Sequence, residues 1–506
     1  MRGVKEILQK MSGAGKDDIA LVEKAYAFAE EAHKDHTRFS GEPYFGHLAE
    51  TAYLLAELGM SGKVVAAGLL HDCIEDVGVA PSTIEREFGK EILFLVEGVT
   101  KLGRLKYRGA ERHRESLRKL LVATGKDARV LIIKMMDRLH NMRTLSHVPE
   151  AKRKRIALET LEIYAAIAHR LGMGLVRREL EDLAFEYAMP KEYQETKKLM
   201  AERSRTTLER LKKMVNTLRK EFAQNGIKGF KTDSRVKGLY SLYRKLARKE
   251  GDIEKIYDIA ALRIIVPTVE DCYRALGLVN NVYQPLPNKI KDYIAFPKPN
   301  GYQSLHTTVF SGDGSIVEVQ IRTPEMHEEA ERGIAAHVEY KEGAKQTGRS
   351  GGSFDWIKSL IPGFARRTTI EEKKNGAPAA QYAPASTPSW LADLENTEED
   401  PELETTLKTD LFNRRVFVFT PTGDVVDLPA ESSPVDFAYA IHSDIGDHIF
   451  GAKVNGKMVP LDTHLHNGDI VEIQTKKTAK PKSKWLDFAK TTLARRHIRN
   501  ALEREK

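Results

Sequence analysis

The chain has 506 residues, enough for three or four domains of about 100–200 residues each. Its 41% hydrophobic and 30% charged residues are typical of a soluble globular protein, and its net charge of +8 is compatible with phosphate-rich ligands or RNA without establishing either. Cys73 and Cys272 are the only cysteines, which excludes a disulfide framework and a CxxC metal site. No apolar run approaches the roughly 20 residues of a membrane span, and the N-terminus lacks the apolar region of a signal peptide. We therefore expect a cytoplasmic protein.

Apolar residues recur at three- and four-residue spacing up to about Pro190, which predicts a helical domain over residues 1–195. The helical pattern continues to about residue 250 but becomes strongly basic. Two apolar runs, Ile259–Val266 and Ser315–Ile321, then have the period of strands, and a helical pattern lies between them. This alternation predicts an α/β domain over residues 196–341.

The last part of the chain changes composition twice. Residues 342–410 are rich in Gly, Ser, Ala, Pro and Lys and then acidic, which predicts a linker. Short strands with turn signals follow, and the Asn455-Gly456 pair between two apolar-rich segments is typical of a hairpin. We expect a small β-rich domain over residues 411–476 and the start of a helical segment over residues 477–506.

A first group of polar residues follows an apolar helical run at residues 64–70. Its members lie four apart in two pairs, so they are expected to form one patch on a helix. Such a patch is costly to bury unless it binds something. The residues of this patch are His71, Asp72, Glu75 and Asp76.

Two imidazoles and two carboxylates are available to bind a metal: His47, His71, Asp72 and Asp137. This mixed set suits a divalent ion with open positions, and it favours Mn²⁺ over a closed zinc site. Such an ion lowers the pKa of a bound water and orients a phosphate. Glu75 and Asp76 would then move protons or hold that water. Three cations either share the phosphate charge or are surface charges on an amphipathic helix: Lys134, Arg138 and Arg143.

The strings GEPYFGH, LLHDCIEDV and DRLHNMRTL resemble the hydrolase domain of the RelA/SpoT (Rel) family, within the HD phosphohydrolase superfamily. The resemblance implies removal of the 3′-pyrophosphate from (p)ppGpp. It also implies that Arg38 lies near the guanine and that Asn141 and Thr144 contact the nucleotide. Leu48 stands where the family usually has Pro, and Met135-Met136 replace Leu-Ala; both differences concern packing.

A second group of polar residues, within 234–245 and 289–309, mixes cations, hydroxyls and aromatics suited to a triphosphate and a base. Transfer of pyrophosphate from ATP to a hydroxyl needs charge neutralisation, a metal anchor and a proton acceptor. Asp258 and Glu318, each expected near a strand edge of one sheet, fit the last two roles. The spacing alone leaves this interpretation open, because no Walker A or kinase-type glycine loop is present.

YDIAALRIIV, KDYIAFPKPNGYQSLHTTV and EVQIRTPEMHEEAERGIAAH resemble the synthetase domain of the same family. The resemblance implies that Asp258 binds Mg²⁺, that Glu318 activates the 3′-hydroxyl of GDP or GTP, and that Tyr302 stacks on the guanine. Lys291 lies in a KIKD string that resembles the basic signature of bifunctional members. Further implied nucleotide-binding residues are Lys298, Asn300 and His306 near the acceptor, and Arg235, Lys237, Ser241 and Lys245 for ATP. Ser234 replaces the usual Gly before Arg235.

Residues 415–475 resemble a TGS domain. In ribosome-linked members this domain meets the 3′ end of deacylated tRNA, and His442 matches the position of that contact. A lone His in a β-rich domain is otherwise a structural or surface residue. The zinc-finger-like and ACT modules of long members are missing, so we expect either a truncated chain or a short variant.

Taken together, the resemblances imply a multidomain fold. We expect an all-α HD-type hydrolase domain, an α/β nucleotidyltransferase-like synthetase domain with a mixed sheet, and a small β-rich, β-grasp-like TGS domain. The expected function is that of a bifunctional stringent-response enzyme, which makes (p)ppGpp from ATP and GDP or GTP and hydrolyses it again. Two alternatives stay open: a hydrolase with an inactive synthetase domain, and a ribosome- or tRNA-binding regulator.

Overall fold

The computed structural model describes residues 2–103, 127–248, 260–336 and 415–503, apart from positions 12, 288, 299, 312–314, 422–424, 467 and 477. The chain divides into two compact units, Met1–Arg349 and Ser350–Lys506, which we describe separately. The predicted linker lies outside the described residues. Within the described ranges, no helix is long and apolar enough to cross a membrane.

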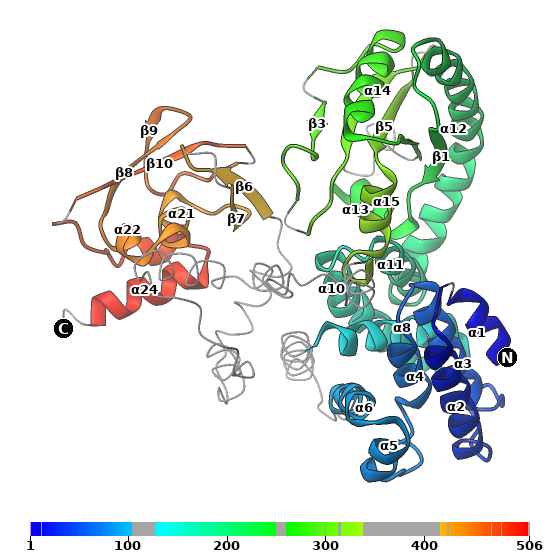
Figure 1. The fold of residues 1–506 in the computed structure, drawn as a ribbon. Coiled ribbons are helices and arrows are strands. Elements are labelled where there is room, and N and C mark those ends of the chain that lie inside the picture. The colour runs from blue at the N-terminus through cyan, green and yellow to red at the C-terminus, as the bar shows by residue number, and fades with distance from the viewer. Residues whose placement is uncertain are drawn as a thin grey trace, which may run out of the picture. The chain divides into compact units, whose positions relative to one another are not determined.

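The first part of unit 1 is helical, as predicted (Figure 1). Its core is built from apolar faces such as that of α4, where every residue from Val64 to Leu70 is buried. Asp127 caps α8 by accepting a hydrogen bond from the backbone N–H of Arg129. The helices are α1 (Val4–Lys10), α2 (Lys16–Ala32), α3 (Phe45–Glu57), α4 (Gly62–Leu70), α5 (Pro81–Phe88), α6 (Lys90–Gly103), α8 (Ala128–Arg143), the short η1 (Leu145–His147), α9 (Glu150–Glu159), the π-helical η2 (Thr160–Tyr164), α10 (Ala165–Arg170) and α11 (Gly174–Ala188).

The prediction of one helical patch over residues 71–76 is wrong. Helix α4 ends at Leu70, and the next residues form consecutive turns. His71 and Asp72 therefore lie where the helix stops, whereas Glu75 and Asp76 are exposed in the turn. Four-residue spacing places side chains on one face only while the helix continues.

The second part of unit 1 is an α/β fold around a five-stranded mixed sheet of order β1-β2-β5-β4-β3. The strands β2 and β5 are parallel, and the other neighbours are antiparallel. Both predicted strands are confirmed, as β2 (Ala260–Ile265) and β5 (Ile316–Arg322). The other elements are α12 (Pro190–Gln224), β1 (Lys231–Val236), α13 (Leu239–Arg248), α14 (Val269–Val282), β3 (Lys291–Asp292), β4 (Leu305–Phe310) and α15 (Pro324–Arg332).

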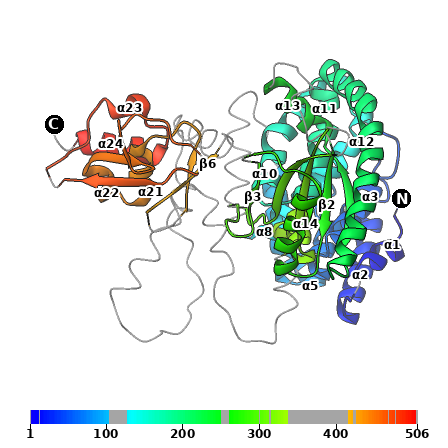
Figure 2. The same cartoon turned by 90° about the horizontal axis from the view of Figure 1, so that it is seen from above.

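Three of these strands, β1, β3 and β4, were not predicted from the sequence. β1 lies within the region that was expected to be helical. It was missed because its segment KTDSRV lies at the edge of the sheet and has almost no apolar residues to show the alternation of a strand. The predicted boundary at residue 195 falls inside α12, which is a continuous helix. α12 and α14 pack against one face of the sheet (Figure 2). The alternation in β5 buries Val317, Val319 and Ile321 in that core and turns Glu318 and Gln320 to the opposite face.

The helical part contacts the α/β part through α11, which touches α12, α13 and α15. Arg332 of α15 donates a hydrogen bond to the backbone carbonyl of Leu58. The backbone N–H of Ile334 donates to the carbonyl of Leu171 over 3.0 Å. Between these contacts, Gly333 adopts φ 56° and ψ −128°, a conformation that only glycine tolerates well.

Replacing Gly333 by Ala is expected to destabilise unit 1. A Cβ atom at this position would collide with the backbone carbonyl oxygen of Leu171. The strained backbone alone costs on the order of 1–3 kcal/mol. Urea unfolding measures the effect. The control is Gly277→Ala in α14, where a Cβ has no atom within 4 Å and the helix gains roughly 0.5–1 kcal/mol. Equal unfolding midpoints for the two variants would contradict the role given to Gly333.

Unit 2 contains a small β-rich domain, as predicted, with a two-stranded sheet β6-β7 and a three-stranded sheet β10-β8-β9. The predicted hairpin is confirmed: Asn455 (φ 51°) and Gly456 (φ 78°) join β8 to β9, as a type I′ turn requires. Helix α21 was not predicted, although Ser433 and Asp436 form a capping box at its start. The elements are β6 (Arg415–Phe419), β7 (Val425–Pro429), α21 (Pro434–Ile441), α22 (Ser443–Asp447), β8 (Ile449–Val454), β9 (Lys457–Val459), β10 (Val471–Thr475), α23 (Trp485–Phe488) and α24 (Thr492–Glu503).

Candidate active sites

Three of the four predicted metal ligands converge in the helical part. His47 on α3, His71 just after α4 and Asp137 on α8 are buried, and one donor atom from each lies within 4.8 Å of the others. Asp72 joins them, because its Oδ2 lies 3.2 Å from His71 Nε2 and 3.8 Å from His47 Nε2. The tyrosine hydroxyl of Tyr44 donates a hydrogen bond of 2.8 Å to the same oxygen.

The donor atoms of this cluster fit a divalent cation. The Nδ1–H of His71 donates to the backbone carbonyl of Gly68 over 2.8 Å, so its buried Nε2 is turned toward the carboxylates. Metal-bound histidines usually donate their other ring nitrogen in this way. Burial disfavours the charged imidazole of His71, but Asp72 and Asp137 outweigh burial and raise its pKa to about 9. A cation bound here would replace that proton.

Asp137 is the best-supported carboxylate of the cluster. Lys134 Nζ lies 2.6 Å from its Oδ2, and Asn141 Nδ2 donates to its Oδ1 over 2.5 Å. Burial opposes ionisation of Asp137, but Lys134 and the imidazoles of His47 and His71 hold its pKa well below the usual value. Lys134, Asp137 and Asn141 thus lie on one face of α8.

His140 orients His47 and was not singled out from the sequence. His140 Nδ1 lies 2.7 Å from His47 Nδ1 and 3.4 Å from Arg38 Nη1. A guanidinium can only donate, so His140 Nδ1 accepts from both neighbours. His47 therefore carries its proton on Nδ1 and leaves Nε2, 3.3 Å from Asp137, as a free lone pair. The available signal was spacing, because His140 follows Asp137 by three residues on α8.

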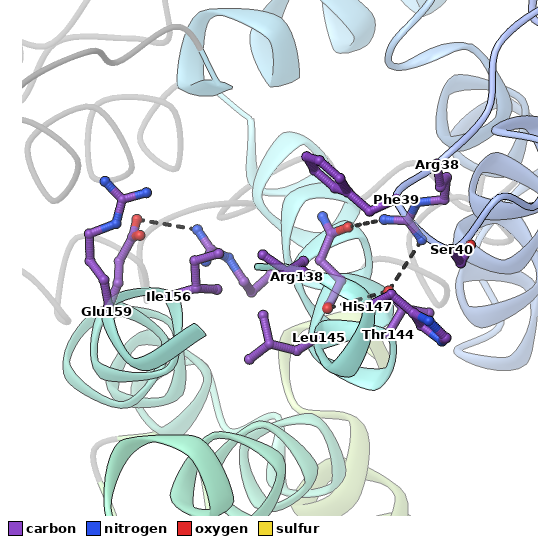
Figure 3. Close-up of a pocket in the computed structure, with 12 residues that line it drawn as sticks. Arg38, Phe39, Ser40, Arg138, Thr144, Leu145, His147, Ile156 and Glu159 are labelled. Atoms are coloured by element: carbon purple, nitrogen blue, oxygen red, sulfur yellow. Dashed lines mark hydrogen bonds and ion pairs between the residues drawn. The ribbon is translucent and has the colours of Figure 1, made fainter. Parts of the chain in front are cut away.

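A cavity of about 260 Å³ adjoins this cluster and contains the predicted nucleotide-binding residues Arg38, Asn141 and Thr144. Figure 3 shows Arg38 directed toward Thr144, with Arg138 and Glu159 paired at the other side of the cavity. Arg38 donates to Asn141 Oδ1 over 2.6 Å and to Thr144 Oγ1 over 3.2 Å. Arg143 forms an ion pair of 2.6 Å with Glu179.

A second site lies on the face of the sheet that is opposite α12 and α14. His306 Nδ1 is 2.8 Å from Glu318 Oε1, and His306 Nε2 is 2.8 Å from the hydroxyl of Tyr302. Burial raises the pKa of Glu318, but His306 and Gln320 outweigh it and lower the pKa to about 2. Because the carboxylate is ionised, it accepts from His306 Nδ1–H, and Tyr302 O–H donates to Nε2.

A cavity of about 350 Å³ connects Glu318 with most of the other residues predicted for this site. Lys298 Nζ lies 4.5 Å from the ring centre of Tyr293 and 5.0 Å from that of Tyr302, which are cation–π distances. Lys291 pairs with His306 between β3 and β4. The predicted residues that line the cavity are Lys237, Ser241, Lys245, Lys298, Asn300, Tyr302 and Glu318. Asp258 lies outside the described residues, and of Arg235 the structure describes only the backbone, within β1.

In unit 2, His442 is exposed and precedes α22. Its Nδ1 accepts a hydrogen bond of 3.1 Å from the backbone N–H of Asp444, so the side chain caps this short helix. The other ring nitrogen, Nε2, belongs to a side chain that is exposed to solvent.

Comparisons with known proteins agree with this architecture. The family signatures described as "HD domain", "Region found in RelA / SpoT proteins" and "TGS domain" match residues 25–174, 234–345 and 416–475. These matches define a multidomain protein with a helical HD domain, an α/β domain and a TGS domain.

Several curated proteins are similar along nearly the whole chain. A guanosine-3′,5′-bis(diphosphate) 3′-pyrophosphohydrolase of Aquifex aeolicus is 42% identical over 99% of this chain and 67% of its own length. A GTP pyrophosphokinase of Myxococcus xanthus is 42% identical over 96% of this chain and 61% of its own length. The bifunctional (p)ppGpp synthase/hydrolase SpoT of Escherichia coli is 40% identical over 96% of this chain and 65% of its own length. The chain belongs to the RelA/SpoT family, and it spans about three fifths to two thirds of the length of these relatives.

Proposed function

We propose that this chain both makes and hydrolyses (p)ppGpp. It would transfer pyrophosphate from ATP to the 3′-hydroxyl of GDP or GTP, and it would hydrolyse (p)ppGpp to GDP or GTP and pyrophosphate. The observation that carries the proposal is the presence of two separate polar sites in unit 1, one around Asp137 and one around Glu318. Relatives named for each activity, and one named for both, support it.

For hydrolysis, His47, His71, Asp72 and Asp137 would hold Mn²⁺, which supplies an activated water and polarises the phosphate when it is bound. Glu75 and Asp76, exposed beside the cluster, would hold that water or move its proton. Arg38, Asn141 and Thr144 would bind the nucleotide in the adjoining cavity. Arg38 would also help to position two of the metal ligands. It contacts His140, which orients His47, and it donates to Asn141, which in turn donates to Asp137.

For synthesis, the 3′-oxygen of the acceptor would attack the β-phosphorus of ATP, and AMP would leave. Glu318 would take the proton from that hydroxyl, with His306 holding the carboxylate in place. Lys237, Ser241, Lys245 and the unplaced side chain of Arg235 would bind ATP, and Asp258 would hold Mg²⁺. The acceptor would be bound by Lys291, Lys298, Asn300, Tyr302 and His306.

We also propose the domain limits given by the sequence: 1–195 for the hydrolase domain, 196–341 for the synthetase domain, 342–410 for a linker, 411–476 for the TGS domain and 477–506 for the start of a helical segment. His442, exposed at the start of α22, would contact deacylated tRNA on the ribosome.

The test uses purified protein in two reactions resolved by anion exchange. With ATP, GDP and Mg²⁺, we expect ppGpp and AMP in equal amounts. With ppGpp and Mn²⁺, we expect GDP and pyrophosphate. Hydrolysis without synthesis would support the alternative of a hydrolase with an inactive synthetase domain. The absence of both activities would leave only the alternative of a ribosome- or tRNA-binding regulator.

The role of His140 leads to a separate prediction about metal binding. His140→Phe removes the acceptor that fixes the His47 tautomer, so the affinity for Mn²⁺ should fall by about 10–100-fold. His140→Asn keeps an acceptor and should recover part of the affinity. Electron paramagnetic resonance of free Mn²⁺ measures both, with His36→Phe, an exposed histidine of the same domain, as control. Unchanged affinity in His140→Phe would exclude this role.

A further inference from the structure

Arg177 belongs to the helical part of unit 1 but lines the cavity of the second site. It lies on α11, whereas the cations across the cavity come from the α/β part: Lys237 before α13, Lys245 on α13, and Lys298 after β3. The loop and helix residues His169, Gly172 and Gly174 line the same wall. The wall of the site around Glu318 is therefore built from both parts of the chain.

Among the described residues Arg177 forms no ion pair with a carboxylate, although Glu181, one turn further along α11, is close enough for the guanidinium to oppose the rise in its pKa that burial causes. Arg177 Nη1 lies 3.0 Å from His169 Nδ1, and the buried Nε of Arg177 has no hydrogen-bond partner among the described residues. Burial and the neighbouring cations, Arg177 first among them, lower the pKa of His169 to about 3, so the imidazole is neutral. The neighbouring Arg178 differs, because it pairs with Glu331 over 2.9 Å. Arg178 thus pairs with a carboxylate within the fold, whereas the hydrogen-bond partner of Arg177 among the described residues is a neutral imidazole.

Cations crowd this side of the cavity. Burial together with Lys291 and Arg177 lowers the pKa of Lys298. His169 contacts both the side chain of Arg177 and the segment that carries Lys298. Its Nδ1 lies 3.0 Å from Arg177 Nη1, and its backbone carbonyl accepts a hydrogen bond of 3.2 Å from Nδ2 of Asn300, two residues after Lys298. Gathering like charges in a partly buried cavity is costly unless an anion compensates them. A guanidinium offers two or more N–H donors to such an anion, with a geometry that matches phosphate.

We propose that Arg177 binds a phosphate group of a nucleotide in the synthetase cavity, so that the helical part of the chain completes this site. The inference rests on the proposed function only for the identity of the ligand as a substrate nucleotide. The ligand class is a nucleoside polyphosphate, GDP or ATP. A consequence is that nucleotide affinity at the synthetase site depends on how α11 is seated against α13 and α15.

Two substitutions separate phosphate binding from a structural role. Arg177→Gln keeps an N–H donor for His169 but removes the charge, whereas Arg177→Lys keeps the charge. If Arg177 binds phosphate, the Kd of GDP or of a non-hydrolysable ATP analogue should rise about 10-fold or more in Arg177→Gln. Arg177→Lys should recover part of that loss. If Arg177 only supports His169, Gln should preserve affinity, and this result would overturn the proposal.

Isothermal titration calorimetry of the full chain with each nucleotide measures these affinities without turnover. Arg86→Gln, at an exposed position of α5, makes the same charge change as a control and should bind both nucleotides normally. Wild-type protein that makes no ppGpp but binds nucleotide in an Arg177-dependent way would contradict the proposed synthesis and leave this inference standing. If the wild type makes ppGpp but the nucleotide affinities of Arg177→Gln are unchanged, the proposed synthesis stands and this inference is contradicted.

Discussion

Asp137→Asn is expected to abolish ppGpp hydrolysis and to leave synthesis intact. The substitution preserves shape but removes the buried negative charge that lies 3.3 Å from His47 Nε2 and 2.6 Å from Lys134 Nζ. Loss of one ligand charge removes several kcal/mol of stabilisation of the metal and of the transition state. This corresponds to a fall in kcat on the order of 10³-fold. Release of GDP and pyrophosphate from ppGpp, followed by anion exchange, measures it.

The variant needs two checks, because Lys134 is left without its carboxylate. Synthesis of ppGpp by the same polypeptide reports whether unit 1 is folded, and Mn²⁺ titration reports whether the ion is lost. Asp17→Asn, an exposed residue in the first turn of α2, is the matched control. Hydrolysis at more than a tenth of the wild-type rate would show that Asp137 is not a ligand of the catalytic ion.

Glu318→Gln is expected to have the converse effect. The amide can still accept from His306 Nδ1–H and from Gln320, so the strand and its neighbours keep their contacts. What is lost is the proton acceptor for the 3′-hydroxyl, which contributes about 10²–10⁴-fold to a rate. Synthesis from ATP and GDP should fall by that factor, with hydrolysis unchanged.

The pH dependence gives a second readout for Glu318. Because His306 and Gln320 outweigh burial, the pKa of Glu318 is about 2, below its usual value. The carboxylate is therefore the ionised base throughout the neutral range and loses its charge only as the pH falls toward 2. Raising the pH should not rescue the Gln variant. Glu325→Gln, exposed at the start of α15, is the control. Retained synthesis in Glu318→Gln would assign the base to another group.

Local patterns in the sequence were sufficient for several features of this protein. Helical periodicity predicted the all-α part, alternation predicted β2 and β5, and the Asn455-Gly456 pair predicted the β8–β9 hairpin. These features depend on residues close together in the chain, where spacing and turn preference act directly. The strings around His71, Asp137 and Glu318 also identified the family, since the order of residue types along a chain can be compared without knowing which residues are in contact.

Only the tertiary structure decided where helix α4 stops, which nitrogen of His47 is free, and which cations face the second cavity. The His47 tautomer depends on His140 and Arg38, which lie far from it along the chain and meet it only in the packed core. Arg177 was indistinguishable in sequence from its neighbour Arg178, yet Arg178 pairs with Glu331, and Arg177 forms no ion pair with any residue that the structure describes. Such differences arise because burial and hydrogen bonding between distant segments set the charge and orientation of each side chain, and periodicity along the chain does not encode them.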